Sequence, residues 1–178
     1  ELARVLAAGG DPAKVVFSGV GKTANEMRAA LQAGILCFNV ESVSELHRLN
    51  QVAGEMGKVA PVSFRVNPDV DPHTHVYTTT GKRETKFGVD LERARRVFDA
   101  FQASPGVQLS GIHLHLGSPV NAVDPYIESV KKAIALIDEL RRAGHEISAL
   151  NMGGGFGAHY ANDEAPLASA YAEAVVPL

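Results

Sequence analysis

The chain alternates between two hydrophobic periods. Short apolar runs and strict alternation predict strands, and apolar positions three and four residues apart predict amphipathic helices. Breaks between them coincide with Gly, Pro, Asp and Ser, which are typical of turns and helix caps. The predicted strands are 15–19, 35–40, 61–67, 107–117 and 147–152. The predicted helices are 1–8, 23–33, 42–57, 90–101, 124–144 and a last one that begins at Pro166.

Strand and helix therefore alternate five times with short connections, which calls for a parallel sheet covered by helices. Within 37–41 and 63–67 a polar set alternates with an apolar set. This favours a barrel, whose strands meet helices on one face and point to a ligand at the barrel mouth, over an open doubly wound sheet. The predicted fold class is α/β, as a partial (β/α)8 TIM-like barrel.

One long segment interrupts this alternation after Asn67-Pro68, before Asp90 caps the next helix. Loops of some twenty residues are usually functional or disordered. It holds His73 and His75, with Lys86 at its end. Taken alone, each of these residues is expected to be exposed to solvent.

Composition adds few constraints. The net charge is -3 and the basic residues are scattered, so no nucleic-acid partner is predicted. One cysteine, Cys37, excludes an internal disulfide, and no apolar run reaches the ~18 residues of a membrane span. A cytoplasmic location and a small core role for Cys37 are expected. Because the chain starts at Glu1 and stops within a helical pattern, it is expected to be a fragment.

The strand end at 111–118 carries the first candidate chemistry. On a strand His113 and His115 share one face, while Gly117 and Ser118 open the following loop. The histidine pair could ligate a metal, but Arg65 at a neighbouring strand end is a poor neighbour for a cation. A neutral histidine stacked on a flat ligand, or buried with a hydrogen bond, fits better, and no metal site is predicted. His47, His145 and His159 are expected at the surface.

Two glycine-rich segments lie at predicted strand ends. Residues 153–158 directly follow a strand, so their amides could form a phosphate nest, although a tight turn that needs positive φ is equally compatible. The segment 19–23 looks like the end of a phosphate-binding P-loop, but Val16 occupies the position of the first required glycine. We reject that motif and expect Lys22 to be a solvated residue at a helix start.

Taken together, these segments resemble the pyridoxal-phosphate-dependent decarboxylases with an alanine-racemase-like barrel. The histidine and glycine motifs are shared across this family, whereas 16–23 and 67–81 resemble its diaminopimelate branch in particular. The matching segments cover nearly the whole chain in family order, and jointly they are specific. They are 16–23, 38–42, 65–68, 74–81, 86–89, 111–118 and 153–155.

The resemblance implies pyridoxal 5'-phosphate as cofactor and a role for five residues. His115 is similar to the histidine that stacks on the pyridine ring, and Ser118 to the hydroxyl that binds the phosphate. Gly154 and Gly155 are similar to the backbone phosphate nest, with Gly155 the better single choice. Arg65 is similar to the strand-end arginine near the ring.

The resemblance also implies what lies elsewhere. The family's Schiff-base lysine is expected upstream on the first barrel strand, so no catalytic residue is assigned here, and Lys86 resembles a structural lysine. Residues 1–178 would be a fragment of a single barrel domain, strands three to seven of eight, with the C-terminal β-domain absent. The Glu-Pro-Gly-Arg motif and the homodimer-interface residues would lie downstream. Pro119-Val120 departs from the polar residue that the family often has after the serine.

The function implied for the intact protein is decarboxylation of meso-2,6-diaminopimelate to L-lysine, with the fragment inactive alone. Its partner would be a small amino-acid substrate, with no membrane involved. Within the family the alternatives are arginine, ornithine or carboxynorspermidine decarboxylases. Outside it, a metal-dependent barrel hydrolase using His113 and His115 and a non-catalytic pyridoxal-phosphate-binding barrel stay open.

Overall fold

The computed structural model of the chain describes residues 1–70, 87–158 and 165–178. The predictions for His73, His75, Lys86 and His159 lie outside these residues, as does the family segment 74–81. Among the helices formed by the described residues, none combines the length and hydrophobicity that crossing a membrane requires.

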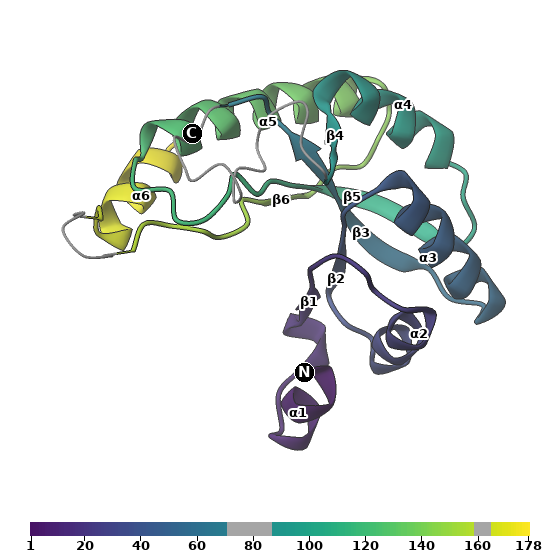
Figure 1. The fold of residues 1–178 in the computed structure, drawn as a ribbon. Coiled ribbons are helices and arrows are strands. Elements are labelled where there is room, and N and C mark those ends of the chain that lie inside the picture. Colours follow the sequence, from purple (N-terminus) through teal and green to yellow (C-terminus); the bar gives the residue numbers. More distant parts are fainter. Residues whose placement is uncertain (71–86, 159–164) are drawn as a thin grey trace.

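Within the described residues, six strands form one parallel sheet, as the alternation of elements predicts. Five of them are neighbours in the order β1-β2-β3-β5-β6, and β4 pairs with β3 away from this path. The sheet curves into a half-barrel, and its helices lie along the outer side (Figure 1). The strands are β1 (Val16–Phe17), β2 (Cys37–Val40), β3 (Ala60–Asn67), β4 (Val89–Asp90), β5 (Val107–His113) and β6 (Ala149–Asn151).

The helices follow the predicted boundaries closely because their N-terminal caps are encoded locally. Thr23, Ser42 and Asp90 each accept a hydrogen bond from the amide three residues later. Thr23 and Glu26 form a complete capping box. The helices are α1 (Leu2–Ala7), α2 (Ala24–Ala33), α3 (Val43–Glu55), α4 (Leu91–Phe101), α5 (Asp124–Arg142) and α6 (Ala168–Val175), with a short 3-10 turn at Pro12–Lys14.

Several boundaries differ from prediction, and β1, β2 and β6 are shorter than the predicted 15–19, 35–40 and 147–152. Helix α5 begins at Asp124 as predicted, with Val123 at its N-cap, but ends at Arg142, and α6 begins at Ala168, two residues after Pro166. Strand β5 ends at His113, not at Gly117. Beyond it Gly117 has a φ of +140° and Pro119 has no amide hydrogen, which a strand cannot accommodate in its ladder. The sixth strand, β4, was not predicted because two residues carry no periodic signal.

The core has two parts. The larger lies between the sheet and α2 to α5, where Ala94, Val97, Phe98 and Phe101 are buried on the predicted face of α4. A smaller cluster joins the loops after β5 and β6 to α5 and α6. Its buried members are Leu116, Val120, Tyr126, Val130, Tyr171 and Val175.

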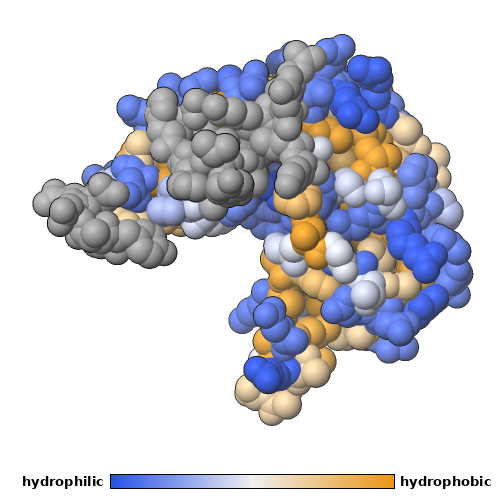
Figure 2. Space-filling model, in the orientation of Figure 1, coloured by the Kyte–Doolittle hydropathy of each residue, from blue (hydrophilic) through white to orange (hydrophobic). Residues whose placement is uncertain are grey.

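The inner side of the half-barrel is not fully covered. Figure 2 shows an apolar strip between the centre of the sheet and the N-terminal segment. Val16 and Val20 are exposed, and α1 has no buried residue. The polar residues of 37–41 and 63–67 lie on strand ends as predicted, and Cys37 is half-buried with its pKa raised by burial.

One prediction about the outer surface is wrong. His145 is 8% exposed, because its Nε2 lies 2.9 Å from an Asp99 carboxylate oxygen and its ring packs edge-on against Phe98. His47, in contrast, is exposed as expected.

We predict that Phe64→Ala lowers the free energy of unfolding by about 3–5 kcal/mol, because the phenyl ring is lost from a close-packed core. Phe64 lies on β3 and is 0% exposed. Val59→Ala is the control, since Val59 is 55% exposed, and should change stability by less than about 0.5 kcal/mol. Chemical unfolding of both variants measures the difference. Equal losses would contradict the assignment of this core.

Candidate functional site

Polar side chains from five parallel strands meet at the carboxyl ends of those strands. They surround a cavity of about 590 Å³, within the usual range for small-molecule sites. Barrel proteins bind their ligands at this end of the strands. The lining residues are Val16, Ser18, Gly19, Val20, Asn39, Glu41, Arg65, Phe87, His113, His115, Asn151, Gly153 and Gly154.

Arg65 and Glu41 form a buried ion pair at the base of this cavity. Their side chains are 6% and 5% exposed and bonded through Nη1 and Oε2. The second guanidinium nitrogen, Nη2, donates to the His115 carbonyl at 3.3 Å. Arg65 therefore connects the ends of β2 and β3 to the loop that follows β5, and its orientation is fixed from both sides.

Lys22 is buried, so the prediction of a solvated lysine is wrong. Its side chain is 1% exposed and its Nζ lies 2.8 Å from a Glu45 carboxylate oxygen. The same ammonium group donates to the carbonyls of Gly19 and Asn39. Sequence could not reveal this pair, because Glu45 lies 23 positions away. Lys22 holds the loop after β1, which forms one wall of the cavity, against β2 and α3.

An amide network connects that wall to the opposite strand. Asn39 donates to the Ser18 hydroxyl at 2.6 Å and accepts from Asn151 at 3.4 Å. The Asn151 side chain in turn accepts from the Gly153 amide at 2.8 Å. The ends of β1, β2 and β6 are therefore held together by side chains across the base of the cavity.

Both histidines of the predicted pair line the cavity, although only His113 is on a strand. Burial lowers the pKa of His113 to about 4, and Arg65 adds to this while Glu41 partly opposes it. Burial, followed by the charge of Arg65, also lowers the pKa of His115. Both imidazoles are therefore neutral at neutral pH, as a ring that packs against a flat ligand or accepts a hydrogen bond should be.

The two predicted phosphate-binding elements lie side by side. A Cβ atom added to Gly155 would stand 1.8 Å from the Gly117 carbonyl oxygen and 3.3 Å from Ser118 Cβ. Gly155 also has a φ of +80°, which side chains disfavour. Its carbonyl accepts from the Val120 amide at 2.8 Å. The loops after β5 and β6 therefore pack backbone against backbone, and only glycine fits at the contact.

Three buried polar atoms near the strand ends lack a hydrogen-bond partner within the described residues: Arg65 Nε, Asn67 Oδ1 and His113 Nδ1. Unpaired buried polar groups are costly and rare, so they indicate a place for a polar ligand. Together with the neutral His115 ring and the glycine amides, they suit a flat molecule that carries an anionic group. No group of three or more metal-ligating side chains occurs in the parts of the chain that the structure describes.

The structure thus brings Arg65, His115 and Gly154 to one cavity, with Gly155 and Ser118 at its side. Sequence reasoning missed Lys22, Glu45 and the pairing of Glu41. Glu41 belongs to the polar set of 37–41, but no sequence signal pairs it with Arg65 on the next strand. Pro119 and Val120 do not open the site rim, because Val120 is buried and pairs with Phe156.

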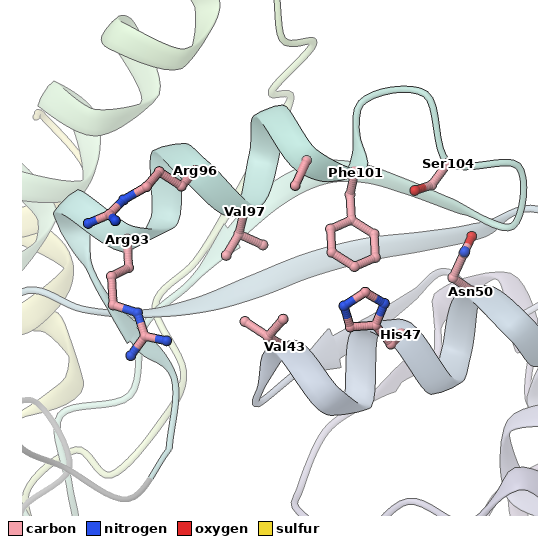
Figure 3. A pocket seen from close by; sticks show the side chains of 9 residues that line it. Val43, His47, Asn50, Arg93, Arg96, Val97, Phe101 and Ser104 are labelled. Carbon is pink, nitrogen blue, oxygen red and sulfur yellow. The ribbon is translucent and has the colours of Figure 1, made fainter.

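A second cavity of about 430 Å³ lies on the outer helical layer, between α3 and α4. Figure 3 shows Arg93 and Arg96 near one end of this groove and Asn50 and Ser104 near the other. The His47 ring packs on Phe101, with ring centroids 4.8 Å apart. None of the five site residues predicted from sequence lines this groove.

The glycine pair supplies a matched test of the loop geometry. Gly155→Ala should destabilise the protein by about 2 kcal/mol or more, because it adds backbone strain and a steric clash. A Cβ at Gly154 would meet nothing within 4 Å, so Gly154→Ala should cost much less. Thermal unfolding of the two variants provides the comparison. Equal stability of the two would show that the loops do not pack as described.

The lowered pKa of His113 predicts that the folded protein loses stability in acid. Its imidazole has a pKa of about 4 when folded against 6.5 when unfolded, so below 6.5 the unfolded state binds a proton that the folded state does not. Between pH 7 and pH 5 this should cost about 2 kcal/mol. In His113→Gln the loss of stability over that interval should be smaller by this amount. Chemical unfolding at the two pH values measures it, and an undiminished loss in the variant would contradict a neutral buried His113.

Known proteins are similar to this chain over almost its whole length. A diaminopimelate decarboxylase from Vibrio cholerae is 52% identical over 176 residues, which cover 99% of this chain and 42% of that protein. One from Haemophilus influenzae is 48% identical over the same number of residues and the same shares of both chains. The chain therefore spans well under half the length of these curated relatives.

A solved structure shows the same similarity as these two sequence relatives. Diaminopimelate decarboxylase from Helicobacter pylori, complexed with L-lysine, superimposes with a TM-score of 0.92 at 36% identity, covering 99% of this chain and 45% of that one. The likeness extends over β1 to β6 and therefore includes the strand ends that form the cavity. The family model that describes the pyridoxal-binding domain of pyridoxal-dependent decarboxylases matches residues 1–178. With its half-barrel and its cavity at the strand ends, the chain belongs to the pyridoxal-dependent decarboxylases, as their pyridoxal-binding domain.

Proposed function

We propose that the protein carrying this chain decarboxylates meso-2,6-diaminopimelate to L-lysine with pyridoxal 5'-phosphate as cofactor. The cofactor assignment is supported by one observation: Arg65, His115 and the Gly154 backbone line the same cavity. The substrate rests on relatives named diaminopimelate decarboxylase that are 48% to 52% identical over 99% of the chain. Decarboxylation of arginine, ornithine or carboxynorspermidine is less supported. A metal-dependent barrel hydrolase and a non-catalytic pyridoxal-phosphate-binding barrel are also less supported.

In this proposal the residues of the chain bind the cofactor and orient its ring. The amides of Gly154 and Gly155 and the exposed Ser118 hydroxyl would hold the phosphate, since none of them donates a hydrogen bond within the described residues. The His115 imidazole would pack against one face of the ring. Being neutral, it would add no positive charge there.

Arg65 would act as a fixed cation beside the ring. Glu41 neutralises it and the His115 carbonyl orients it, so its position costs no reorganisation when the cofactor binds. When bound, pyridoxal phosphate supplies a conjugated ring that accepts the electron pair left on the substrate Cα as CO2 departs. The chain contributes by holding that ring, and therefore the bond to be broken, in a fixed orientation.

Other parts of the proposal lie outside the chain. The lysine that carries the cofactor is assigned to the first barrel strand upstream, and a C-terminal β-domain and a homodimer partner would complete the site. The family resemblance supports these three assignments. Residues 1–178 alone would therefore be inactive. A cytoplasmic location is part of this proposal, and the single cysteine is compatible with it.

The test is CO2 release by the full-length protein. We expect release from meso-diaminopimelate with L-lysine as the second product, and far slower release from ornithine and arginine. The purified protein should also absorb visible light owing to bound pyridoxal phosphate. A faster reaction with ornithine or arginine would replace the substrate assignment, and a colourless protein with stoichiometric zinc would refute the cofactor assignment.

A further inference from the structure

Two tyrosines bind the backbone of the glycine loop without lining the cavity. Tyr126 on α5 and Tyr171 on α6 are 1% and 4% exposed. With Phe156 they form a compact aromatic cluster, in which Tyr126 stacks on Phe156 at 4.9 Å and meets Tyr171 edge-on at 5.4 Å. Helices α5 and α6 are neighbours in Figure 1. This cluster joins the helical layer to both loops of the site.

Each tyrosine hydroxyl binds the backbone of these loops. The Tyr126 hydroxyl donates to the Gly154 carbonyl at 3.0 Å. The Tyr171 hydroxyl donates to the Val120 carbonyl at 2.8 Å and accepts from the Gly157 amide at 3.2 Å. Burial raises the pKa of Tyr126, so its hydroxyl keeps the proton that it donates. The carbonyl groups on the helix side of the loops are therefore occupied.

Through the geometry of the peptide bond, the Tyr126 hydrogen bond to Gly154 also sets the direction of the Gly155 amide. In a planar trans peptide the C=O and the following N–H point in opposite directions. The Gly154 carbonyl points to α5, so the Gly155 amide of the same peptide points away from α5. Among the described residues, nothing accepts a hydrogen bond from that amide. An unpaired N–H held in a fixed direction is what a phosphate oxygen requires.

We propose that Tyr126 is a positioning residue for the cofactor phosphate: by holding the Gly154 carbonyl on the helix side, its hydroxyl directs the Gly155 amide to the phosphate. The inference rests on the proposed function, since it needs a phosphate-bearing cofactor in this cavity. It assigns to Tyr126 a role through the backbone, without contact with the cofactor. No sequence pattern indicates this role, because a tyrosine on a helix face is usually a core residue.

Tyr126→Phe removes only the hydroxyl and keeps the ring that packs on Phe156. Ser129→Ala is the matched control. Ser129 is on the same helix, is 1% exposed and donates to the Pro125 carbonyl within that helix at 2.6 Å. Both variants lose one buried hydroxyl, but only Tyr126 contacts the glycine loop.

The measurement is reconstitution of the full-length apoprotein with two probes, pyridoxal 5'-phosphate and pyridoxal, which lacks the phosphate. Tyr126→Phe should raise the Kd for pyridoxal phosphate about three- to tenfold, the effect of one net hydrogen bond. Its Kd for pyridoxal should be unchanged. The phosphorus NMR resonance of the bound cofactor should shift in this variant. In Ser129→Ala both Kd values and the resonance should match wild type.

Two other results would overturn the positioning role of Tyr126, and they differ in what they say about the proposed function. An unchanged Kd for pyridoxal phosphate in Tyr126→Phe, or an equal loss for both probes, would overturn the positioning role and leave the proposed function standing. A wild-type protein that binds pyridoxal phosphate no more tightly than pyridoxal would overturn the phosphate site itself, and with it the positioning role.

Discussion

The buried pairing of charges at the strand ends is the constraint on which the site depends. Lys22 with Glu45 and Arg65 with Glu41 place two cations and two anions beneath one cavity. Removing such charges from water costs several kcal/mol per ion, so each needs its partner. The Glu41 amide also donates to Glu45 at 3.2 Å. The two pairs are thus one connected unit, which fixes the ends of β2 and β3 relative to α3.

That unit explains how a cavity can be polar and still well defined. The charged groups are neutralised in place, so His113 and His115 experience burial more than net charge and stay neutral. The opposite side of the cavity uses no charge. There the backbones of the loops after β5 and β6 pack against each other at Gly155 and are held from behind by tyrosine hydroxyls. In the proposed function, a flat, anionic cofactor would meet a fixed cation on one side and oriented amides on the other.

Much of the fold was predictable because its determinants are local. Helices α2, α3 and α4 begin where Thr23, Ser42 and Asp90 cap them, and the alternation of periods predicted a parallel sheet. The wrong predictions have two causes. Strand β4 pairs through two residues, and β5 ends early because of backbone geometry at Gly117. Neither leaves a periodic pattern. His145 and Lys22 were placed in solvent because their partners, Asp99 and Glu45, are distant in sequence.

The sequence by itself determined the order of elements, the strand ends that bear polar side chains, and the motifs His115 to Ser118 and Gly153 to Gly155. These are set by neighbouring residues, through hydrophobic periodicity and the conformations of glycine and proline. Only the tertiary structure decided which residues work together. It paired Glu41 with Arg65, buried Lys22 and placed Tyr126 behind Gly154. Such pairings depend on strand register and helix packing, which bring together residues 23 to 28 positions apart.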